Sequence, residues 1–541
     1  MLENKISFAD LTNRFLEDYW RLNPVEATHA GVHRYDSFLP DWSDNAIVER
    51  QNWRYSSRAA FQKFDEAALN PSQQLDRKVA LTELAAQAVE DEWQWVKRAP
   101  AFYIEEAMNG LNYLLARPDT RLTVTEREEQ LLARLAAISK LLAQGQANLQ
   151  SELVPPEWVE IGIVAVNGAI GFVKNLTLPS KPTSEDLRQR TLAALSEYKE
   201  FIQQLKPTGQ FALGPELFER LLREQHGLNM TPAELYKLGE QTAHKVEAQL
   251  IELASDIAPG QSWQSIIDSL KTAHPTRDTL LQTYAHEAEL ARAFVKTQQL
   301  INIPPGEKLE IQPTAPFLRA TMPLGHFDKT PPFADTDNLG ILYITPIDPA
   351  LPSERQNELL SAHCHTAIRA ICLHETYPGH HLQLWYAKLH ASPLRKQFAS
   401  TLFVEGWALY CEEMMEEAGY FDTPALSLWQ LKNSMWRAVR MMIDVGLHCG
   451  MLDLTAAARI LTEKAGLEPN TALGEARRYT TSPTQPSSYM LGRNRIVELR
   501  RQYEKKQGHN SKLADFHERL LGYSSVSPAF IPDELDSHIS S

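Results

Sequence analysis

Residues 371–381 have the sequence ICLHETYPGHH, and they hold more potential chemistry than any other stretch of the chain. Three histidines lie in this segment, and Glu375 directly follows the first of them, His374. In the zinc-hydrolase motif H-E-x-x-H, two histidines one helical turn apart bind the metal and the glutamate acts as general base on water. Pro378 stands here in place of the second histidine, so the segment predicts a metal site of a modified form.

The second histidine ligand has two candidates, His380 and His381. Pro378 cannot donate the backbone hydrogen bond that an unbroken helix requires. A bulge that absorbs two extra residues at Pro378 and Gly379 would return His380 to the usual place of the second ligand. His381 lies two helical turns from His374, a rise of roughly 10 Å. The spacing therefore favours His380 and leaves His381 as the alternative.

Glu405 is the candidate for the third ligand. It lies in the apolar segment 403–412, FVEGWALYCE, which would bury its carboxylate, and a buried carboxylate needs a partner or a metal. Catalytic zinc sites often combine two histidines and one carboxylate with an open position. The spacing from His380 leaves room for one helix to end and a second to return.

Two of these segments resemble the signature blocks of a known family. Residues His374 to Gln383 and Glu405 to Glu412 are similar to the blocks of a bacterial family that is named only as a domain of unknown function. That family has the signature HExxPGHH. It is grouped with the gluzincin zinc metallopeptidases, such as thimet oligopeptidase and the thermostable carboxypeptidases. Weaker matches at 23–28 and 489–493 extend the resemblance over most of the chain. The resemblance implies a zinc peptidase-like site in which His374, Glu375 and Glu405 keep the family roles.

Composition excludes several function classes. The chain of 541 residues is 43% hydrophobic and 23% charged, with a net charge of −14, which is typical of a soluble globular protein and disfavours nucleic acid or an anionic membrane as partner. Its four cysteines form no C-x-x-C pair, and free thiols suit a reducing cytosol. The first residues lack the pattern of a signal peptide. We therefore expect a cytoplasmic protein that binds neither nucleic acid nor membrane.

Hydrophobic periodicity predicts a mainly α fold. Amphipathic helices recur through the first 300 residues, one of them starting at Thr231 with Pro232 and Glu234 as start signals. Prolines then interrupt the pattern near 303, residues 339–344 read as a short strand, and helices resume from 352. We predict a two-lobed helical metallopeptidase-like fold, with an N-terminal helical lobe (1–302) and a catalytic lobe (303–541) that holds a short edge strand and a small β-sheet beside a central cleft.

Further site residues are predicted from these elements. Related peptidases bind the substrate backbone along an edge strand, so Tyr343 is a candidate substrate contact, although a purely structural sheet fits the pattern equally. Arg440, Asp444 and His448 share one helical face, and polar groups on so apolar a helix are either paired or line a cleft. We expect Asp444 to orient a zinc-bound histidine, and His448 to contact substrate or stabilise the oxyanion.

The remaining candidates lie near the motif segments and the chain end. Tyr489 is expected to donate to the tetrahedral intermediate, as tyrosines do in related zinc peptidases, and Tyr377 is a second candidate. Arg493, like Arg440, could bind a substrate carboxylate through its guanidinium. Glu412 is expected beside the metal ligands in a supporting role. By contrast, the segment HEAEL at 286–290 has a leucine where the second ligand belongs and is read as a solvent-exposed helix face.

Two function hypotheses follow. In the first, Zn²⁺ held by His374, His380 and Glu405 activates water for the hydrolysis of peptide bonds in short peptides, with Glu375 as general base. Such an enzyme could be a carboxypeptidase, an oligopeptidase or an amide hydrolase of a small metabolite. In the second, the protein is a non-catalytic helical scaffold whose metal is structural or absent. Glu375 favours the enzyme, because a closed structural zinc site has no need of a free carboxylate next to its ligand.

Overall fold

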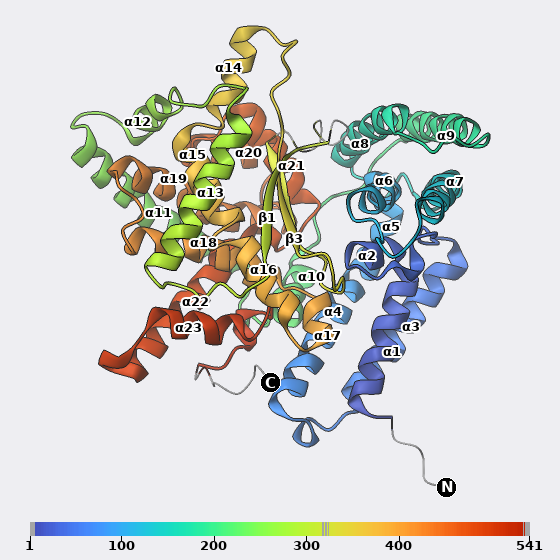
Figure 1. Cartoon of the computed structure of the whole chain (residues 1–541), viewed down its shortest axis with the longest axis horizontal. Helices are drawn as coiled ribbons and strands as arrows, with labels where there is room; N and C mark the ends of the chain where they lie inside the picture. The colour runs from blue at the N-terminus through green and yellow to red at the C-terminus, as the bar shows by residue number, and fades with distance from the viewer. Residues whose placement is uncertain (1–5, 316–318, 320–321, 323, 534, 536–541) are drawn as a thin grey trace. The chain divides into compact units, whose positions relative to one another are not determined.

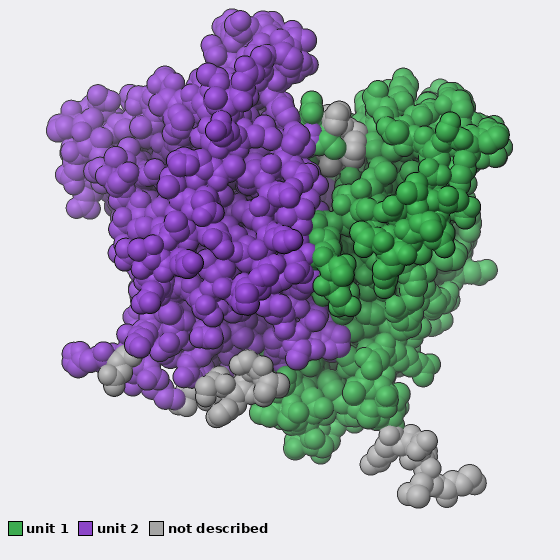
Figure 2. All heavy atoms as spheres, in the orientation of Figure 1, with its two compact units in different colours: residues 1–211, 315–323, 331–337 green, residues 212–314, 324–330, 338–541 purple. Residues whose placement is uncertain are grey.

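The computed structural model describes residues 6–315, 319, 322, 324–533 and 535. The chain is mainly helical with one small sheet, as the sequence predicts (Figure 1). It divides into two compact units, coloured separately in Figure 2: unit 1 is residues 1–211, 315–323 and 331–337, and unit 2 is residues 212–314, 324–330 and 338–541.

Unit 1 is built from helices alone in its described part. They are α1 (Phe8–Leu22), α2 (Pro24–His29), η1 (His33–Tyr35), α3 (Asp44–Gln62), η2 (Glu66–Ala68), α4 (Pro71–Glu92), α5 (Trp95–Arg98), α6 (Pro100–Ala116), α7 (Val124–Asn148), α8 (Pro156–Asn175) and α9 (Ser184–Gln204). Asn23 caps the end of α1, and Pro24 begins α2. Tyr103, Leu135 and Ile202 bury their side chains in the core shared by α6, α7 and α9.

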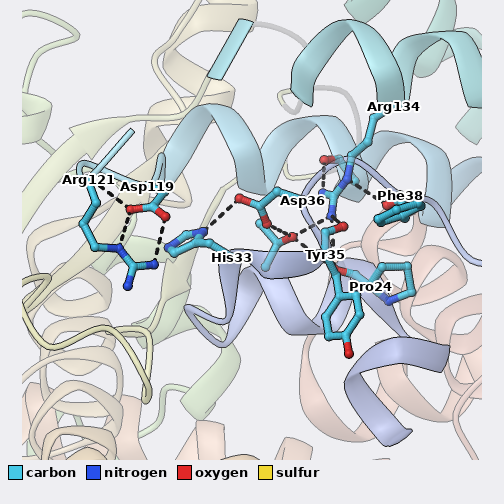
Figure 3. A network of polar contacts seen from close by, with 10 residues as sticks. Pro24, His33, Tyr35, Asp36, Phe38, Asp119, Arg121 and Arg134 are labelled. Atoms are coloured by element: carbon cyan, nitrogen blue, oxygen red, sulfur yellow. Dashed lines mark hydrogen bonds and ion pairs between the residues drawn. The ribbon is translucent and has the colours of Figure 1, made fainter. Parts of the chain in front are cut away.

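A buried arginine ties several segments of unit 1 together (Figure 3). Arg134, on α7, donates hydrogen bonds to the carbonyl oxygens of Phe38 (2.9 Å), Gly110 (2.6 Å) and Pro24 (3.1 Å) and to the Thr28 hydroxyl (2.6 Å). That hydroxyl in turn donates to Asp36 (2.6 Å). Every nitrogen of the guanidinium thus has an acceptor, so the buried charge is stabilised by the chain around it.

Helix α8 combines a length of 20 residues with an apolar composition. Among the described residues it is the one helix long and apolar enough to cross a membrane, judged by length and composition. Val166, Ala169 and Phe172 on this helix are nevertheless buried in the core of unit 1. A helix of a hydrophobic core passes the same test of length and apolarity.

Unit 2 contains the sheet and most of the helices. Its elements are α10 (Pro215–Arg220), the π-helical turn η3 (Leu221–Gln225), α11 (Pro232–Ile257), α12 (Trp263–Leu270), α13 (Leu280–Thr297), β1 (Lys308–Pro313), β2 (Gly325–Asp328), β3 (Leu339–Ile344), α14 (Ser353–Ser361), α15 (His365–Glu375), α16 (His380–Leu389), α17 (Pro393–Gln397), α18 (Thr401–Glu417), α19 (Pro424–His448), α20 (Leu454–Ala465), α21 (Pro469–Thr480), α22 (Gln485–Gln507), η4 (Gly508–Asn510), α23 (Leu513–Leu521) and η5 (Pro528–Phe530). The start signals of α11 are confirmed, because Thr231 and Glu234 form a capping box.

The boundary between the units differs from the predicted boundary at residue 302. It falls at 211, since residues 212–302 belong to unit 2. Helix α11 packs along α19, and α13 packs on α15 and β1 (Figure 1). The contacts of α11 with α19 and of α13 with α15 join elements far apart in sequence, and local periodicity carries no information about them. All residues predicted for the site lie in unit 2.

The sheet also corrects a prediction. Its strand order is β1-β3-β2, with β1 parallel and β2 antiparallel to β3. Residues 339–344 form a strand as predicted, but this strand is central, so its assignment as an edge strand is wrong. Leu342 and Ile344 pack against Tyr284 of α13 and Ile368 of α15, which joins the sheet to the helix that carries the motif.

Candidate metal centre

The motif spans a break between two helices. Helix α15 ends at Glu375 and α16 begins at His380, so the predicted continuous helix with a bulge is wrong. The Gly379 N–H donates back to the Leu373 carbonyl oxygen (3.1 Å), and the indole of Trp407 donates to the Pro378 carbonyl oxygen (2.9 Å). A Cβ at Gly379 would lie 1.9 Å from the His374 carbonyl oxygen, so the turn requires glycine. This tight turn sets the His380 ring 4.7 Å from that of His374.

His381 points into a different environment. Its Nε2 lies 3.2 Å from Glu307, and a Cβ at Gly340 of β3 would lie 2.5 Å from its Nδ1. The Tyr377 hydroxyl donates to the same carboxylate (2.5 Å), as does Arg292 (2.9 Å). Burial would raise the pKa of Glu307, but these three partners lower it to about 2. The Tyr377 hydroxyl thus has a partner within the protein, and the predicted substrate contact at Tyr377 stays a prediction.

Glu405 completes a cluster with the two other histidines. Its Oε2 lies 3.6 Å from His374 Nε2 and 3.4 Å from His380 Nε2. Ligand atoms held tetrahedrally around zinc at about 2.0 to 2.1 Å lie about 3.3 to 3.4 Å apart. Glu405 Oε2 is also buried and has no hydrogen-bond partner in the described part of the chain. The spacing of Glu405 from each histidine and the donor types of the three residues therefore fit a zinc ion.

The carboxylates and histidines of this cluster shift one another's pKa values. Burial would raise the pKa of Glu405, but His374 and His380 hold it well below its usual range. Burial likewise would lower the pKa of His374, but Glu405 and Glu412 raise it to about 9. The Nδ1 of His374 lies 2.9 Å from Glu412, an arrangement that turns Nε2 toward Glu405. A carboxylate in this position is typical of metal-binding histidines.

Glu375 borders the cluster without being held by it. Ligand atoms of His374, Glu375 and His380 lie within 4.8 Å of one another, which is a second possible grouping around a metal. The shorter distances to Glu405 favour Glu405 as the third ligand. Among the residues that the structure describes, Glu375 forms no hydrogen bond or ion pair, and its side chain is partly exposed. It is therefore available to accept a proton beside the cluster.

Helix α22 brings Tyr489 to the same place. Helices α18 and α22 approach closely, since a Cβ at Gly406 would lie 2.5 Å from the Gly492 Cα. This contact places Tyr489 next to Glu405 and stacks its ring on His374, with 6.3 Å between centroids. Burial and the charge of Glu405 raise the pKa of Tyr489 to about 12, so its phenol stays protonated at neutral pH.

Two residues of α19 do not take their predicted roles. Asp444 accepts hydrogen bonds from the backbone N–H of Thr484 (3.1 Å) and from the Ser487 hydroxyl (2.6 Å), so it caps the start of α22 instead of orienting a histidine. His448 is fully buried, with Nε2 at 3.0 Å from the Tyr479 carbonyl oxygen. The shared helical face was correctly read from the sequence, but this face packs on α21 and α22.

The predicted carboxylate-binding arginines already have carboxylate partners. Arg440 donates to Glu475 (3.2 Å) and to the Tyr479 hydroxyl (2.7 Å), and it also lies over the Tyr489 ring at 4.5 Å. Arg493 pairs with Glu413. Both arginines thus support the surrounding helices, and the structure does not place either of them as an anchor for a substrate carboxylate.

Sequence reasoning missed two residues beside the cluster. His326 of β2 stacks on Tyr343 (4.8 Å between centroids), and the predicted substrate contact at Tyr343 stays a prediction. Burial lowers the pKa of His326, while the charges of Asp328 and Glu375 act in the opposite direction. Gln485 donates to both Glu405 (3.4 Å) and Tyr489 (3.3 Å). Neither residue stands in a recognisable motif, since one lies in a four-residue strand and the other follows a loop.

Comparison with solved structures shows that this fold occurs elsewhere. A candidate lipoprotein of unknown function from Shewanella oneidensis matches with a TM-score of 0.78 at 23% identity, over 97% of this chain and 98% of that one. A candidate lipoprotein from Colwellia psychrerythraea matches with a TM-score of 0.79 at 18% identity, over the same shares. A search of curated proteins gave no match.

The predicted cytoplasmic location is contradicted by this comparison. Both matched structures are described as lipoproteins, a class that is attached to membranes by covalent lipid. The prediction rested partly on unpaired cysteines. Three of the four, Cys364, Cys372 and Cys411, are buried, and a buried thiol is inert whatever the redox state of the compartment.

The similarity extends to a sequence family. The family model described as "Bacterial protein of unknown function (DUF885)" matches residues 24–535, which includes the motif segment, Glu405 and Tyr489. The chain belongs to this bacterial family.

Proposed function

We propose that the protein is a zinc-dependent hydrolase that cleaves amide bonds in short peptides. The observation that carries the proposal is the convergence of His374 Nε2, His380 Nε2 and Glu405 Oε2, with 3.4 and 3.6 Å between the carboxylate and the two imidazoles. A buried carboxylate oxygen without a hydrogen bond is costly unless a ligand occupies the position in front of it. The order of the ligand residues along the chain is the basis for proposing a relationship to gluzincin peptidases.

His374, His380 and Glu405 would hold the zinc ion, and Glu412 would keep the His374 ring in place. Zinc in such a site supplies Lewis acidity, which makes water nucleophilic near neutral pH and polarises a carbonyl group. The two histidines must be neutral to bind a metal, so metal binding and protonation of His374 compete.

The neighbouring residues supply the proton chemistry. Glu375 is partly exposed beside the cluster, and it would accept a proton from the attacking water and later deliver that proton to the leaving amine. The Tyr489 phenol remains protonated and lies against His374, so it would donate to the oxygen that becomes negative in the tetrahedral transition state. Tyr343 and His326, on the neighbouring strands, are candidates to contact the substrate.

The choice among peptide substrates follows from the arginines. Arg440 and Arg493 are both engaged by glutamates, so a grip on the C-terminal carboxylate has no support from their geometry. We therefore favour cleavage that does not depend on a free C-terminus, as by an oligopeptidase, over carboxypeptidase action. Hydrolysis of an amide bond in a small metabolite would use the same residues. The hydrolysis assay described next also tests this alternative.

The test combines metal analysis with a hydrolysis assay. Purified protein, dialysed against metal-free buffer, should retain about one zinc per chain and cleave members of a short-peptide library. A chelator should abolish cleavage, and added zinc should restore it. Protein that retains no zinc and gains none on titration would contradict the proposal and favour a non-catalytic scaffold. Protein that binds zinc but cleaves no peptide or small amide would contradict the hydrolase function alone.

A further inference from the structure

Gln485 occupies the first position of α22 and contacts two residues of the candidate site at once. Its side-chain Nε2 donates to Glu405 Oε1 (3.4 Å) and to the Tyr489 hydroxyl oxygen (3.3 Å). A primary amide carries two N–H hydrogens, so both contacts can exist together. Glu405 approaches the histidines with its other oxygen, Oε2. The amide therefore binds the one carboxylate oxygen that does not face His374 and His380.

The orientation of this amide is fixed from its other side. Arg478 of α21 donates from Nη1 to Gln485 Oε1 (3.3 Å), and Arg478 itself is held by Glu475 (2.9 Å). Because a guanidinium can only donate, the Gln485 oxygen must face Arg478 and the NH₂ group must face Glu405. The opposite rotamer would place two donors against each other.

The backbone around Gln485 is also fixed. Asp444 accepts the N–H groups of Thr484 (3.1 Å) and Ser487 (3.2 Å), on either side of Gln485. Thr484 has φ of 68°, a left-handed conformation that a non-glycine residue adopts only where the surroundings hold it. The start of α22 is therefore anchored to α19, and the Gln485 side chain extends from a defined position.

We infer that Gln485 is a positioning residue that sets both the carboxylate of Glu405 and the phenol of Tyr489. The inference rests on the proposed zinc site. Holding Oε1 leaves Oε2 directed at the position between the two histidines. Accepting a hydrogen bond from Gln485 leaves the Tyr489 proton free to be donated elsewhere. One amide thus couples the geometry of a metal ligand to that of the proposed oxyanion donor.

Zinc affinity and a cobalt spectrum test this inference without relying on turnover. Gln485→Leu keeps the side-chain volume and removes the donors, and it should weaken zinc binding by about 10- to 100-fold, the usual effect of losing a partner of a metal ligand. Arg478→Met releases the amide without removing it, and its loss should be smaller. Gln502→Leu, on the same helix but bonded to Glu498, is the matched control and should bind as wild type does. The d–d absorption of Co²⁺-loaded protein should change in Gln485→Leu and stay unchanged in the control.

The outcomes separate this inference from the proposed function. If wild-type protein binds zinc and Gln485→Leu binds it within about twofold with an unchanged cobalt spectrum, the positioning role is wrong while the zinc site stands. If the control variant loses as much affinity as Gln485→Leu, the effect is one of helix stability and the inference fails. If wild-type protein binds no zinc, the proposed function is wrong, and the positioning role that rests on it is wrong as well. Arg478→Met keeps the test valid should Gln485→Leu not fold, because Arg478 is exposed and far less embedded.

Discussion

Unit 1 and unit 2 each bury a polar cluster, and the two clusters are satisfied in different ways. Around Arg134, every guanidinium nitrogen meets a carbonyl or hydroxyl oxygen of the chain at hydrogen-bond distance. Around His374, Glu405 Oε2 lies 3.6 and 3.4 Å from the two histidine Nε2 atoms and is buried without a hydrogen-bond partner among the described residues. The first cluster is satisfied by hydrogen bonds within the chain, and the second brings three metal-ligating atoms together at ion-pair distances.

This difference distinguishes a structural network from a binding site. Buried polar groups that hydrogen-bond to one another stabilise the fold, while two imidazoles and a carboxylate that converge at ion-pair distance also form the donor set of a metal site. The histidines support the same distinction. Burial lowers the pKa values of His226 and His363 to about 4, but carboxylates raise the pKa of the buried His374 to about 9. The histidine with the raised pKa is the one that lies between Glu405 and Glu412.

The largest effect should come from substitution of Glu375, which lies beside the cluster and forms no hydrogen bond or ion pair among the described residues. Glu375→Gln keeps the side-chain size and should retain zinc, but it removes the proton acceptor. Turnover should fall by about 10²- to 10⁴-fold, the scale of general-base catalysis. Steady-state kinetics on a confirmed substrate measures this, with the exposed Glu289→Gln on α13 as the control. A Glu375→Gln variant with near wild-type turnover would remove Glu375 from the chemistry.

Substitution of Arg134 should lower the stability of the fold and leave zinc binding unchanged. Arg134→Met leaves the carbonyl oxygens of Phe38, Gly110 and Pro24 without their buried donor, and it should lower the free energy of unfolding by about 3 to 5 kcal/mol. Zinc stoichiometry of the folded protein should not change. Urea unfolding followed by tryptophan fluorescence, alongside metal analysis, measures both quantities. A loss of zinc in the folded variant would show that the two clusters are not independent.

The buried neutral histidines predict a smaller effect on acid stability. Burial lowers the pKa of His226 from 6.5 to about 4, so its contribution to stability is present above pH 6.5 and is lost as pH falls toward 4. Between pH 7 and pH 5 this loss is about 2 kcal/mol. His226→Gln should therefore lose about that much less stability than wild type over this interval, as measured by urea unfolding at both pH values. Equal losses would mean that His226 is not held neutral by burial.

The smallest effect concerns Arg493, which pairs with Glu413. Arg493→Ala should change kcat/KM by less than about threefold, which is under 1 kcal/mol. The ratio of rates on a free-acid peptide and its C-terminal amide should be the same in variant and wild type. A selective loss on the free acid would restore this arginine as a carboxylate anchor.

The sequence predicted features that depend on neighbouring residues and failed on those that depend on packing. His374 and Glu375 stand in one motif, and Thr231 and Glu234, which form the capping box of α11, lie within one turn of each other. Asp444 was assigned to a histidine because polar groups on so apolar a helical face were expected to line a cleft, but the partner of a helical face is set by which helix packs on it. Residues 308–313 and 325–328 lie among prolines, so the two strands that flank β3 were not recognised.

The break between α15 and α16 shows the same limit within the motif itself. Pro378 indicated that the helix could not continue regularly, and a bulge was the local solution that kept His380 near His374. The structure instead ends one helix and starts another, with the Trp407 indole of α18 bonded to the Pro378 carbonyl oxygen. That bond comes from a helix more than twenty residues further along, so the local sequence could not show which solution would be used.

Zinc titration of His380→Ala and His381→Ala tests the central claim most directly. The two histidines are adjacent in sequence and both are buried, but His380 faces Glu405 and His381 faces Glu307. Alanine at 380 should abolish stoichiometric zinc, as should His374→Ala, while alanine at 381 should leave about one zinc per folded chain. His286→Ala, at an exposed position of α13, serves as the control for loss of an unrelated histidine. Retention of stoichiometric zinc by folded His380→Ala would contradict the proposed metal centre.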